Sequence, residues 1–412
     1  MRWVKRLAKR FIFLVISAFY KIAPGYVSEV VDAKVQRMNS QRPARFMSAA
    51  PVKNPEISVG SIMTDSIEVP PENEEAIIKR LIASYTAATD RQAFAATPYL
   101  PGAAWKKVLD PGWQDYRQAI SQNDEMLLAK MLRNCFRNEA LSGFWGGMKM
   151  FQTFCELNEY ERDRRIDLFK MQYEAWRRHF PHTPMEELAA PRIGNPWGYV
   201  VGGELLYEPV FEYHYHAHYF QTLLAPLEAP LVLEIGGGFG GLAYHILKCA
   251  PSTKYIGLDL PENILLQAYY LSSAFPKARI LTFSKEIEMV NRETIDAYDI
   301  ILMPNFMTPQ IASSTADLIV NVRSLSEMPS ESIAEYIRQI DRIGRLWFFH
   351  ENIFKARLDG LFGIPSSEFP KPFDHILVAA SESRWPRYDR NSAYPCQENL
   401  YLKRNVIQRP TS

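Results

Sequence analysis

The feature that most constrains the fold is an apolar run that leads directly into a cluster of glycines. Residues Leu231 to Ile235 are apolar apart from Glu234, five glycines follow within Gly236 to Gly241, and a helical pattern then runs from Leu242 to Cys249. Glycines are needed at such a turn because a Cβ would hold the backbone away from a ligand, and because a tight turn often requires a positive φ. The order of strand, glycine turn and helix predicts a cofactor-binding unit.

Beyond Pro230, short β-branched runs alternate with helical patterns, which is typical of a doubly wound α/β sheet. The candidate strands are Leu231 to Ile235, Tyr255 to Leu258, Arg279 to Phe283, Tyr298 to Met303, Asp317 to Val322, Arg345 to Phe349, His375 to Ala379 and Asn399 to Lys403.

The region before Pro230 is expected to be mainly helical. Apolar residues return every three or four positions from Ile77 to Tyr85 and from Met126 to Cys135. The stretch from Met148 to Phe180 has no Pro or Gly and predicts one long helix or two stacked ones. Dense Pro and Gly from Pro181 to Gly203 predict a loop. We expect three parts: an N-terminal helix and linker (1–60), a helical acceptor-side region (61–228) and a cofactor domain (229–412).

The N-terminus combines basic and apolar residues. Arg2, Lys5, Arg6, Lys9 and Arg10 precede an apolar run from Phe11 to Tyr20, which is shorter than the roughly 20 residues that a membrane-spanning helix needs. We expect residues 1–20 to form a helix that contacts a membrane surface, on a cytoplasmic protein. The alternatives are a structural N-terminal helix and, last, a secretion signal, for which Ser17 to Lys21 offers a poor cleavage site. The chain has 47 Lys and Arg against 46 Asp and Glu, so its charge does not indicate a nucleic-acid partner.

Two cofactors compete for the glycine turn. Gly236, Gly238 and Gly241 match the GxGxxG pattern of nicotinamide enzymes. Glu234, Gly236, Gly238 and Gly240 instead read E-x-G-x-G-x-G, with an acid just before the turn. A carboxylate there suits the ammonium group of S-adenosylmethionine and would repel a diphosphate. The sequence therefore favours S-adenosylmethionine.

A second acid, Asp259, ends the following strand about 20 residues later, where a carboxylate can accept hydrogen bonds from ribose hydroxyls. A cap of the helix that begins near Pro261 is the alternative role for Asp259. Asn305 follows another strand. It is predicted to contact the cofactor, and the alternative is a role in a plain turn. The predicted cofactor-binding residues are Glu234, Gly236, Gly237, Gly238, Gly240, Asp259 and Asn305.

The C-terminal half resembles a family of sugar O-methyltransferases encoded with bacterial polysaccharide genes. The resemblance rests on three segments, Glu234 to Leu242, Asp259 to Glu262 and Asp317 to Met328. It implies a class I methyltransferase (Rossmann-like) fold, S-adenosylmethionine as donor and a glycan or activated sugar as acceptor. That sheet has seven strands, so either Arg279 to Phe283 or Tyr298 to Met303 is an extra or edge strand.

Candidate catalytic residues follow the strand ends, where ligands bind in open α/β sheets. His350 is the first choice for the base that removes the hydroxyl proton, because its ordinary pKa is near neutrality. Glu327 is the second, as base or as an acceptor that orients the sugar. The alternatives are a strand-end role for His350 and a helix cap for Glu327. Asn321, Ser326 and Glu351 meet the same positional test and are predicted to bind the acceptor.

Three histidines lie between Tyr213 and Tyr219. His214 and His218 share a face if this segment is helical. A metal site is possible chemically, but no carboxylate or Cys completes a familiar ligand spacing. We therefore predict no metal, and assign His214 and His218, with Trp197 of the Pro-rich segment, to the wall beside the acceptor.

The sequence thus predicts an S-adenosylmethionine-dependent O-methyltransferase that acts on a sugar hydroxyl. The alternatives are an NAD-dependent sugar dehydrogenase or epimerase, which Glu234 disfavours, and a non-catalytic glycan-binding protein with a relic cofactor pocket.

Overall fold

A computed structural model describes residues 58–59, 73–141, 147–354, 363–383 and 396–404. The N-terminal residues 1–20 and most of the predicted linker lie outside these ranges. Two linker residues form the short strand β1 (Ser58–Val59), which pairs with β2 (Tyr199–Val201). In the described part of the chain, no helix has both the length and the hydropathy that a membrane crossing requires.

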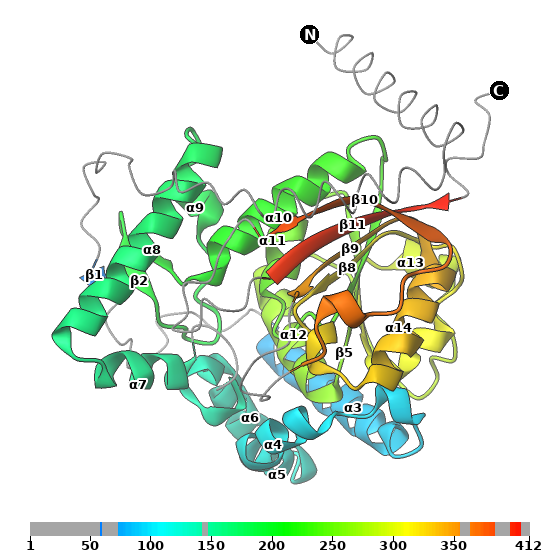
Figure 1. The fold of residues 1–412 in the computed structure, drawn as a ribbon. Coiled ribbons are helices and arrows are strands. Elements are labelled where there is room, and N and C mark those ends of the chain that lie inside the picture. The colour runs from blue at the N-terminus through cyan, green and yellow to red at the C-terminus, as the bar shows by residue number, and fades with distance from the viewer. Residues whose placement is uncertain (1–57, 60–72, 142–146, 355–362, 384–395, 405–412) are drawn as a thin grey trace, which may run out of the picture.

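An eight-stranded sheet forms the centre of the C-terminal part, in the order β10-β11-β9-β8-β4-β5-β7-β6 (Figure 1). Six adjacent strands, β9, β8, β4, β5, β7 and β6, run parallel to one another. Strand β11 is antiparallel to both β9 and β10. All eight predicted strands are confirmed. Their bounds are β4 (Leu231–Ile235), β5 (Lys254–Asp259), β6 (Ile280–Thr282), β7 (Ile300–Pro304), β8 (Ala316–Val322), β9 (Gly344–Ile353), β10 (His375–Glu382) and β11 (Cys396–Lys403).

The strand order settles which run is the additional strand. β7 pairs with β5 inside the sheet, and β6 pairs only with β7 among the described strands. The run from Arg279 to Phe283 is therefore the edge strand. β4 lies between β5 and β8, so the order of the sheet reverses there, which creates a topological switch point. This mostly parallel, doubly wound sheet is a class I methyltransferase, Rossmann-like fold.

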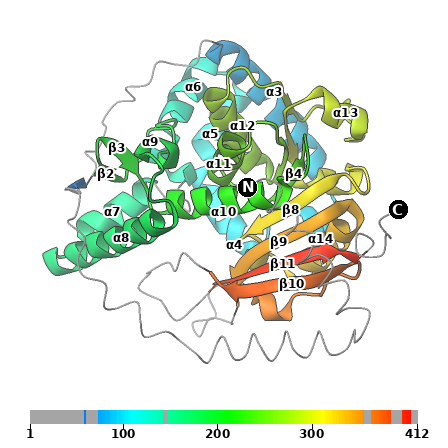
Figure 2. The same ribbon diagram turned by 90° about the horizontal axis from the view of Figure 1, so that it is seen from above.

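Helices cover both faces of the sheet (Figure 2). One face carries α10 (Pro209–Leu224), α11 (Gly241–Cys249) and α12 (Pro261–Ala274), with α3 (Glu74–Gln92) packed on α12. The other carries α13 (Arg292–Ala297) and α14 (Ser330–Ile343). In β4, Val232 packs into the first core, while Leu231 and Leu233 pack into the second. Alternate side chains of a strand point to opposite faces, so a strand covered on both sides reads as a continuous apolar run.

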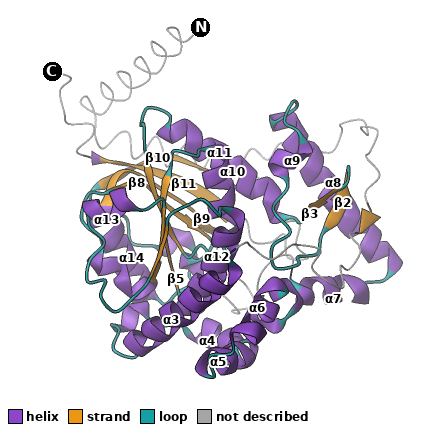
Figure 3. Cartoon of the chain, turned by 180° about the vertical axis from the view of Figure 1, so that it is seen from behind, coloured by secondary structure: helices purple, strands orange, loops and turns teal. Residues whose placement is uncertain are grey.

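The region before the sheet is mainly helical, as expected (Figure 3). The stretch from Met148 to Phe180 forms two helices, because Asn158 and Glu161 make a capping box that starts the second. The prediction of a loop from Pro181 to Gly203 is partly wrong, since this segment contains the short helix α9 (Met185–Leu188) and strand β2.

The other elements of this region are α4 (Ala103–Gly112), α5 (Gln114–Ser121), α6 (Glu125–Arg133), α7 (Met148–Glu156), α8 (Glu159–His179) and β3 (Glu204–Leu206).

Short 3₁₀ helices complete the described structure, and two of them follow strand ends that face the site described below. They are η2 (Thr97–Tyr99), η3 (Cys135–Arg137), η4 (Glu139–Leu141), η5 (Asn305–Gln310), η6 (Leu325–Glu327) and η7 (Ser366–Glu368).

Candidate active site

A cavity of about 220 Å³ opens at the carboxyl ends of β4, β5, β7 and β8, next to the switch point of the sheet. Open α/β sheets bind their ligands at this place. The predicted cofactor residues Glu234, Gly236, Gly237, Gly238, Asp259 and Asn305 all line it. The N-terminal region closes another side of the cavity with Trp105 of α4 and the segment around Leu100.

The glycine turn holds the chain in conformations that other residues rarely adopt. Gly236 has a φ of +76°, and a Cβ there would lie 2.0 Å from Ser324 Oγ. Its N–H donates to the carbonyl of Leu258 (2.8 Å), which ties the turn to β5. Gly240 has a φ of +99° and starts α11, but it is not among the residues that line the cavity. Its backbone forms the turn into the helix, and its contact with the cofactor stays a prediction.

Glu234 is a buried carboxylate at the carboxyl end of β4. The hydroxyl of Tyr255 donates to its Oε2 (2.5 Å), and Gln267 donates to that hydroxyl (3.2 Å). Burial raises the pKa of Glu234 to about 7, although the Tyr255 hydrogen bond lowers it. A buried carboxylate with a raised pKa ionises readily only when a cation approaches or the pH rises.

This raised pKa predicts a pH-dependent effect of Glu234→Gln on stability. The carboxyl group of Glu234 binds its proton more tightly in the folded protein than in the unfolded chain. Its favourable contribution to the free energy of unfolding is therefore complete below about pH 4.5 and is lost as the pH rises to about 7. Gln carries no charge, and its amide oxygen can accept the Tyr255 hydrogen bond. We expect the variant and the wild type to melt together at pH 4.5, and the variant to melt higher at pH 8. Calorimetry without ligand at both pH values checks this, and a lower melting temperature at pH 8 would contradict it.

Asp259 ends β5 and faces both the cavity and the glycine turn. Its carboxylate accepts the N–H of Gly238 (2.8 Å), the N–H of Leu260 (2.7 Å) and the amide of Asn263 (2.9 Å). Burial raises its pKa to about 6, against the lowering effect of these donors. These contacts tie Asp259 to the glycine turn and to the start of α12, whose N-cap residue is Leu260 and which has no side-chain cap. The same carboxylate also lines the cavity.

Asn305 follows β7 and lines the cavity. Its side-chain nitrogen donates to the carbonyl of Tyr99 (2.9 Å), which ties the end of β7 to the N-terminal region. Its Oδ1 is buried and has no hydrogen-bond partner among the described residues.

The segment after β8 holds the glycine turn in place. The amide of Asn321 donates to the carbonyl of Ile235 (2.8 Å) and to Ser324 Oγ, and Ser324 donates to the same carbonyl (3.1 Å). Asn352 donates to Asn321 (2.8 Å) and accepts the N–H of Ser326 (3.0 Å). Asn321 and Ser326 are fully buried and do not line the cavity. Their assignment as acceptor residues is corrected, because the Asn321 amide faces this internal network and the Ser326 hydroxyl is buried away from the cavity.

Arg323 is a cavity residue that the sequence reasoning missed. Its φ is +65°, an uncommon conformation for a non-glycine residue. Its guanidinium lies 2.7 Å from a carboxylate oxygen of Glu212 on α10 and 2.6 Å from one of Glu351 on β9. Glu351 is fully buried and does not line the cavity. Its assignment to the acceptor is corrected, because its carboxylate neutralises Arg323.

Glu327 lies on η6 at the open side of the cavity, as predicted from its position after β8. It is exposed, and its Oε2 accepts the indole N–H of Trp105 (3.1 Å). This contact joins the N-terminal region to the C-terminal domain directly at the site. Glu327 combines a solvent-accessible carboxylate with a fixed neighbour, which suits a group that takes a proton.

His350 does not reach the cavity. Strand β9 continues to Ile353, so His350 lies inside the strand, buried among the rings of Phe348, Phe369 and Tyr401. Burial lowers its pKa to about 3. The assignment of His350 as base is corrected, because its imidazole is enclosed by aromatic side chains and is a weak base there.

The residues predicted to form the acceptor wall also lie elsewhere. His214 is fully buried on α10, where Trp176 donates to its Nδ1 (3.2 Å), and His218 is one turn further along. Trp197 packs against Phe151 and donates to the carbonyl of Gly147 (2.6 Å). None of the three lines the cavity. These assignments are corrected, because packing in the helical region encloses all three side chains.

The cavity residues that sequence reasoning missed are Trp105 of the N-terminal region, Arg323, and Tyr336 of α14. Arg323 lies within the segment from Asp317 to Met328 that carries the family resemblance, and that segment was the available signal for it. Ser324 follows β8, and Tyr213 begins the histidine-rich segment that was expected beside the acceptor; both line the cavity. Trp105 carries no local pattern that marks it.

No family model and no curated protein matches this chain. Solved structures with similar folds include a protein named as a sarcosine dimethylglycine methyltransferase from Galdieria sulphuraria. It is 10% identical to this chain, the match covers 47% of this chain and 85% of that one, and the TM-score is 0.35. A mitomycin 7-O-methyltransferase has 12% identity, coverage of 75% and 73%, and a TM-score of 0.32. An N-methyltransferase from Bradyrhizobium japonicum has 14% identity, coverage of 47% and 94%, and a TM-score of 0.31.

Proposed function

We propose that the protein is an S-adenosylmethionine-dependent O-methyltransferase that acts on a hydroxyl group of a sugar or glycan. The observation that carries this proposal is the acidic charge of the cavity. The carboxylates of Glu234, Asp259 and Glu327 line it, and the guanidinium of Arg323 is already paired with two further carboxylates. Such a cavity favours a cationic ligand and disfavours a dinucleotide diphosphate.

The residues present fit this cofactor. Glu234 would hold its ammonium group, directly or through water, and Asp259 would accept hydrogen bonds from its ribose hydroxyls. Asn305 lines the same cavity at the end of β7. The turn at Gly236 leaves no room for a Cβ, so main chain rather than side chain meets the ligand. When bound, the cofactor supplies a methyl group that its sulfonium already activates.

The remaining chemistry belongs to the protein. An acceptor hydroxyl must be held at attack distance and in line with the methyl group. As the new C–O bond forms, the hydroxyl proton must leave, and the carboxylate of Glu327 is positioned at the cavity mouth to take it. Trp105 holds that carboxylate through its indole N–H. Arg323 and Ser324 keep the loop after β8 in place beside it.

Two features support a sugar as the acceptor. The three segments of family resemblance include Asp317 to Met328, which forms this side of the cavity. The acceptor side also contains the flat rings of Trp105 and Tyr213 beside the carboxylate of Glu327. Rings that can cover an apolar sugar face, next to a group that accepts hydrogen bonds from hydroxyls, suit a pyranose.

Calorimetry distinguishes this function from the NAD-dependent alternative. We expect S-adenosylhomocysteine to bind the full-length protein and NAD⁺ to show no heat of binding at the same concentration. Tight binding of NAD⁺ alone would overturn the proposal.

A transfer assay then tests catalysis. Methyl-labelled S-adenosylmethionine is incubated with nucleotide sugars and oligosaccharides that present free hydroxyls, and the label is followed into product. Labelled sugar supports the proposal. Cofactor binding without transfer to any sugar, together with tight binding of glycans, would favour the non-catalytic glycan-binding alternative.

A further inference from the structure

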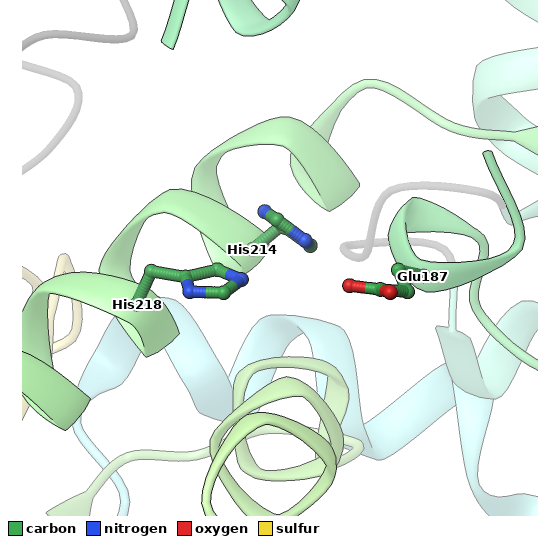
Figure 4. A group of neighbouring side chains, drawn as sticks. All are labelled: Glu187, His214 and His218. Atoms are coloured by element: carbon green, nitrogen blue, oxygen red, sulfur yellow. The ribbon is translucent and has the colours of Figure 1, made fainter. Parts of the chain in front are cut away.

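We propose that Glu187, His214 and His218 form a binding site for a divalent transition-metal ion of the zinc type. One ligand atom from each residue lies within 4.8 Å of the other two. Figure 4 shows the two imidazole rings on successive turns of α10 and the Glu187 carboxylate facing them from α9. Residues four apart on a helix share a face, so α10 presents both rings to the same point.

The imidazole nitrogens give an independent reason to expect a ligand. His214 is fully buried, and its Nε2 has no hydrogen-bond partner among the described residues; the same holds for Nε2 of His218. Buried polar atoms in folded proteins are nearly always paired. A metal ion bound to both nitrogens would engage two atoms that the surrounding side chains leave unsatisfied, and it would replace the hydrogen bond from Trp176 to His214 Nδ1.

The donor set of the cluster suits a transition metal. Two imidazoles and one carboxylate favour Zn²⁺, Co²⁺ or Ni²⁺ over Mg²⁺ and Ca²⁺, which prefer oxygen ligands. Glu187 is exposed, so water can complete the coordination.

A second cluster meets the same distance criterion and is not proposed as a metal site. It consists of Glu212, His216 and Glu351. The guanidinium of Arg323 lies within 2.7 Å of Glu212 and 2.6 Å of Glu351, so a positive charge already occupies the space between those carboxylates. At the first cluster Lys248 interacts electrostatically with Glu187, but its ammonium donates to the backbone carbonyls of Glu186 and Ala189 and not to the Glu187 carboxylate.

The proposed ion has a structural role. Its ligands do not line the cofactor cavity, but Tyr213, which precedes His214 on α10, does. The ion would join α9 to α10 and so hold the helix that presents Tyr213 to the acceptor side. The expected consequence is a higher melting temperature in the presence of metal, because an ion that binds only the folded state stabilises it.

Titration with ZnCl₂ tests the proposal on full-length protein treated with chelator and then freed of it. Glu187→Gln keeps the size of an exposed side chain and removes a ligand, so we expect at least about a tenfold loss of Zn²⁺ affinity. Glu186→Gln is the matched control, because Glu186 is the exposed neighbour on the same short helix. Zn²⁺ should raise the melting temperature of the wild type and the control, and raise that of Glu187→Gln much less. Equal affinities in Glu187→Gln and Glu186→Gln, or no binding by the wild type, would overturn the site.

Trp176 provides a second test. Its indole N–H donates to His214 Nδ1 (3.2 Å), so the proton of the neutral ring is on Nε2 in this arrangement. Metal binding at Nε2 moves that proton to Nδ1, and the Trp176 contact must then be given up. Trp176→Phe removes the competing donor, and we expect Zn²⁺ to bind more tightly by about threefold to tenfold. A loss of affinity in this variant, with the fold retained by circular dichroism, would contradict ligation through His214 Nε2.

Discussion

Replacing Gly236 with alanine is expected to weaken the binding of S-adenosylhomocysteine by about a hundredfold or more. The new Cβ would lie 2.0 Å from Ser324 Oγ in a residue whose φ is +76°. The left-handed conformation costs about 1–2 kcal/mol and the overpacking about 1–3 kcal/mol. Ser324 cannot move freely, because Asn321 and the carbonyl of Ile235 hold it. The turn must therefore shift away from the ligand, and calorimetry measures the loss directly.

Two further variants isolate the cause. Gly202→Ala places a methyl group at a φ of +60° with nothing within 4 Å, so it reports the backbone cost alone and should leave ligand affinity unchanged. Combining Gly236→Ala with Ser324→Gly removes the atoms that clash and should restore part of the affinity. Wild-type affinity in Gly236→Ala would mean that this turn does not contact the cofactor.

Changing Glu327 to glutamine is expected to lower kcat for sugar methylation by about a hundredfold or more, because a positioned base contributes roughly 10²–10⁴-fold. The amide oxygen of Gln can still accept the Trp105 hydrogen bond, so the contact between the two regions is retained. The affinity for S-adenosylhomocysteine should change little. Steady-state kinetics together with calorimetry separates these two effects.

The control for Glu327 is Glu331→Gln, which removes a nearby exposed carboxylate that is not part of the cavity lining and should leave kcat unchanged. Adding formate to Glu327→Ala distinguishes a base from a structural role. A small carboxylate can replace a missing base and restore turnover, but it cannot restore a missing packing contact. Wild-type kcat in Glu327→Gln would remove this residue from the mechanism.

Much of the cofactor side of the cavity could be predicted from short segments of sequence. Glu234 and Asp259 lie at the carboxyl ends of β4 and β5, which meet at one edge of the sheet, so their proximity follows from the parallel arrangement. The glycines between Gly236 and Gly240 mark the turn for the same local reason. The acceptor side was not predictable in this way, because Trp105 and Tyr213 come from helices that are distant in the chain.

His350 shows where local reasoning failed. A side chain whose ordinary pKa is near neutrality, placed after an apolar run, is a reasonable candidate for a base. Strand β9, however, extends four residues beyond Phe349 and pairs with β11. Whether a strand continues is decided by the partner strand that satisfies its backbone groups, and no pattern within Arg345 to Phe349 contains that information. His350 is consequently buried among aromatic rings, where its pKa is lowered to about 3.

The amino-acid sequence alone determined the eight strands, the glycine turn and the two acids at the strand ends, because periodicity, φ preferences and strand polarity act over a few residues. Only the tertiary structure decided which polar side chains face the cavity and which face each other. It turned Asn321, Ser326 and Glu351 inward, and it brought Glu187 to His214 and His218 to supply the carboxylate that their own segment lacks. The physical reason is that burial and pairing depend on packing between segments that are remote in the chain.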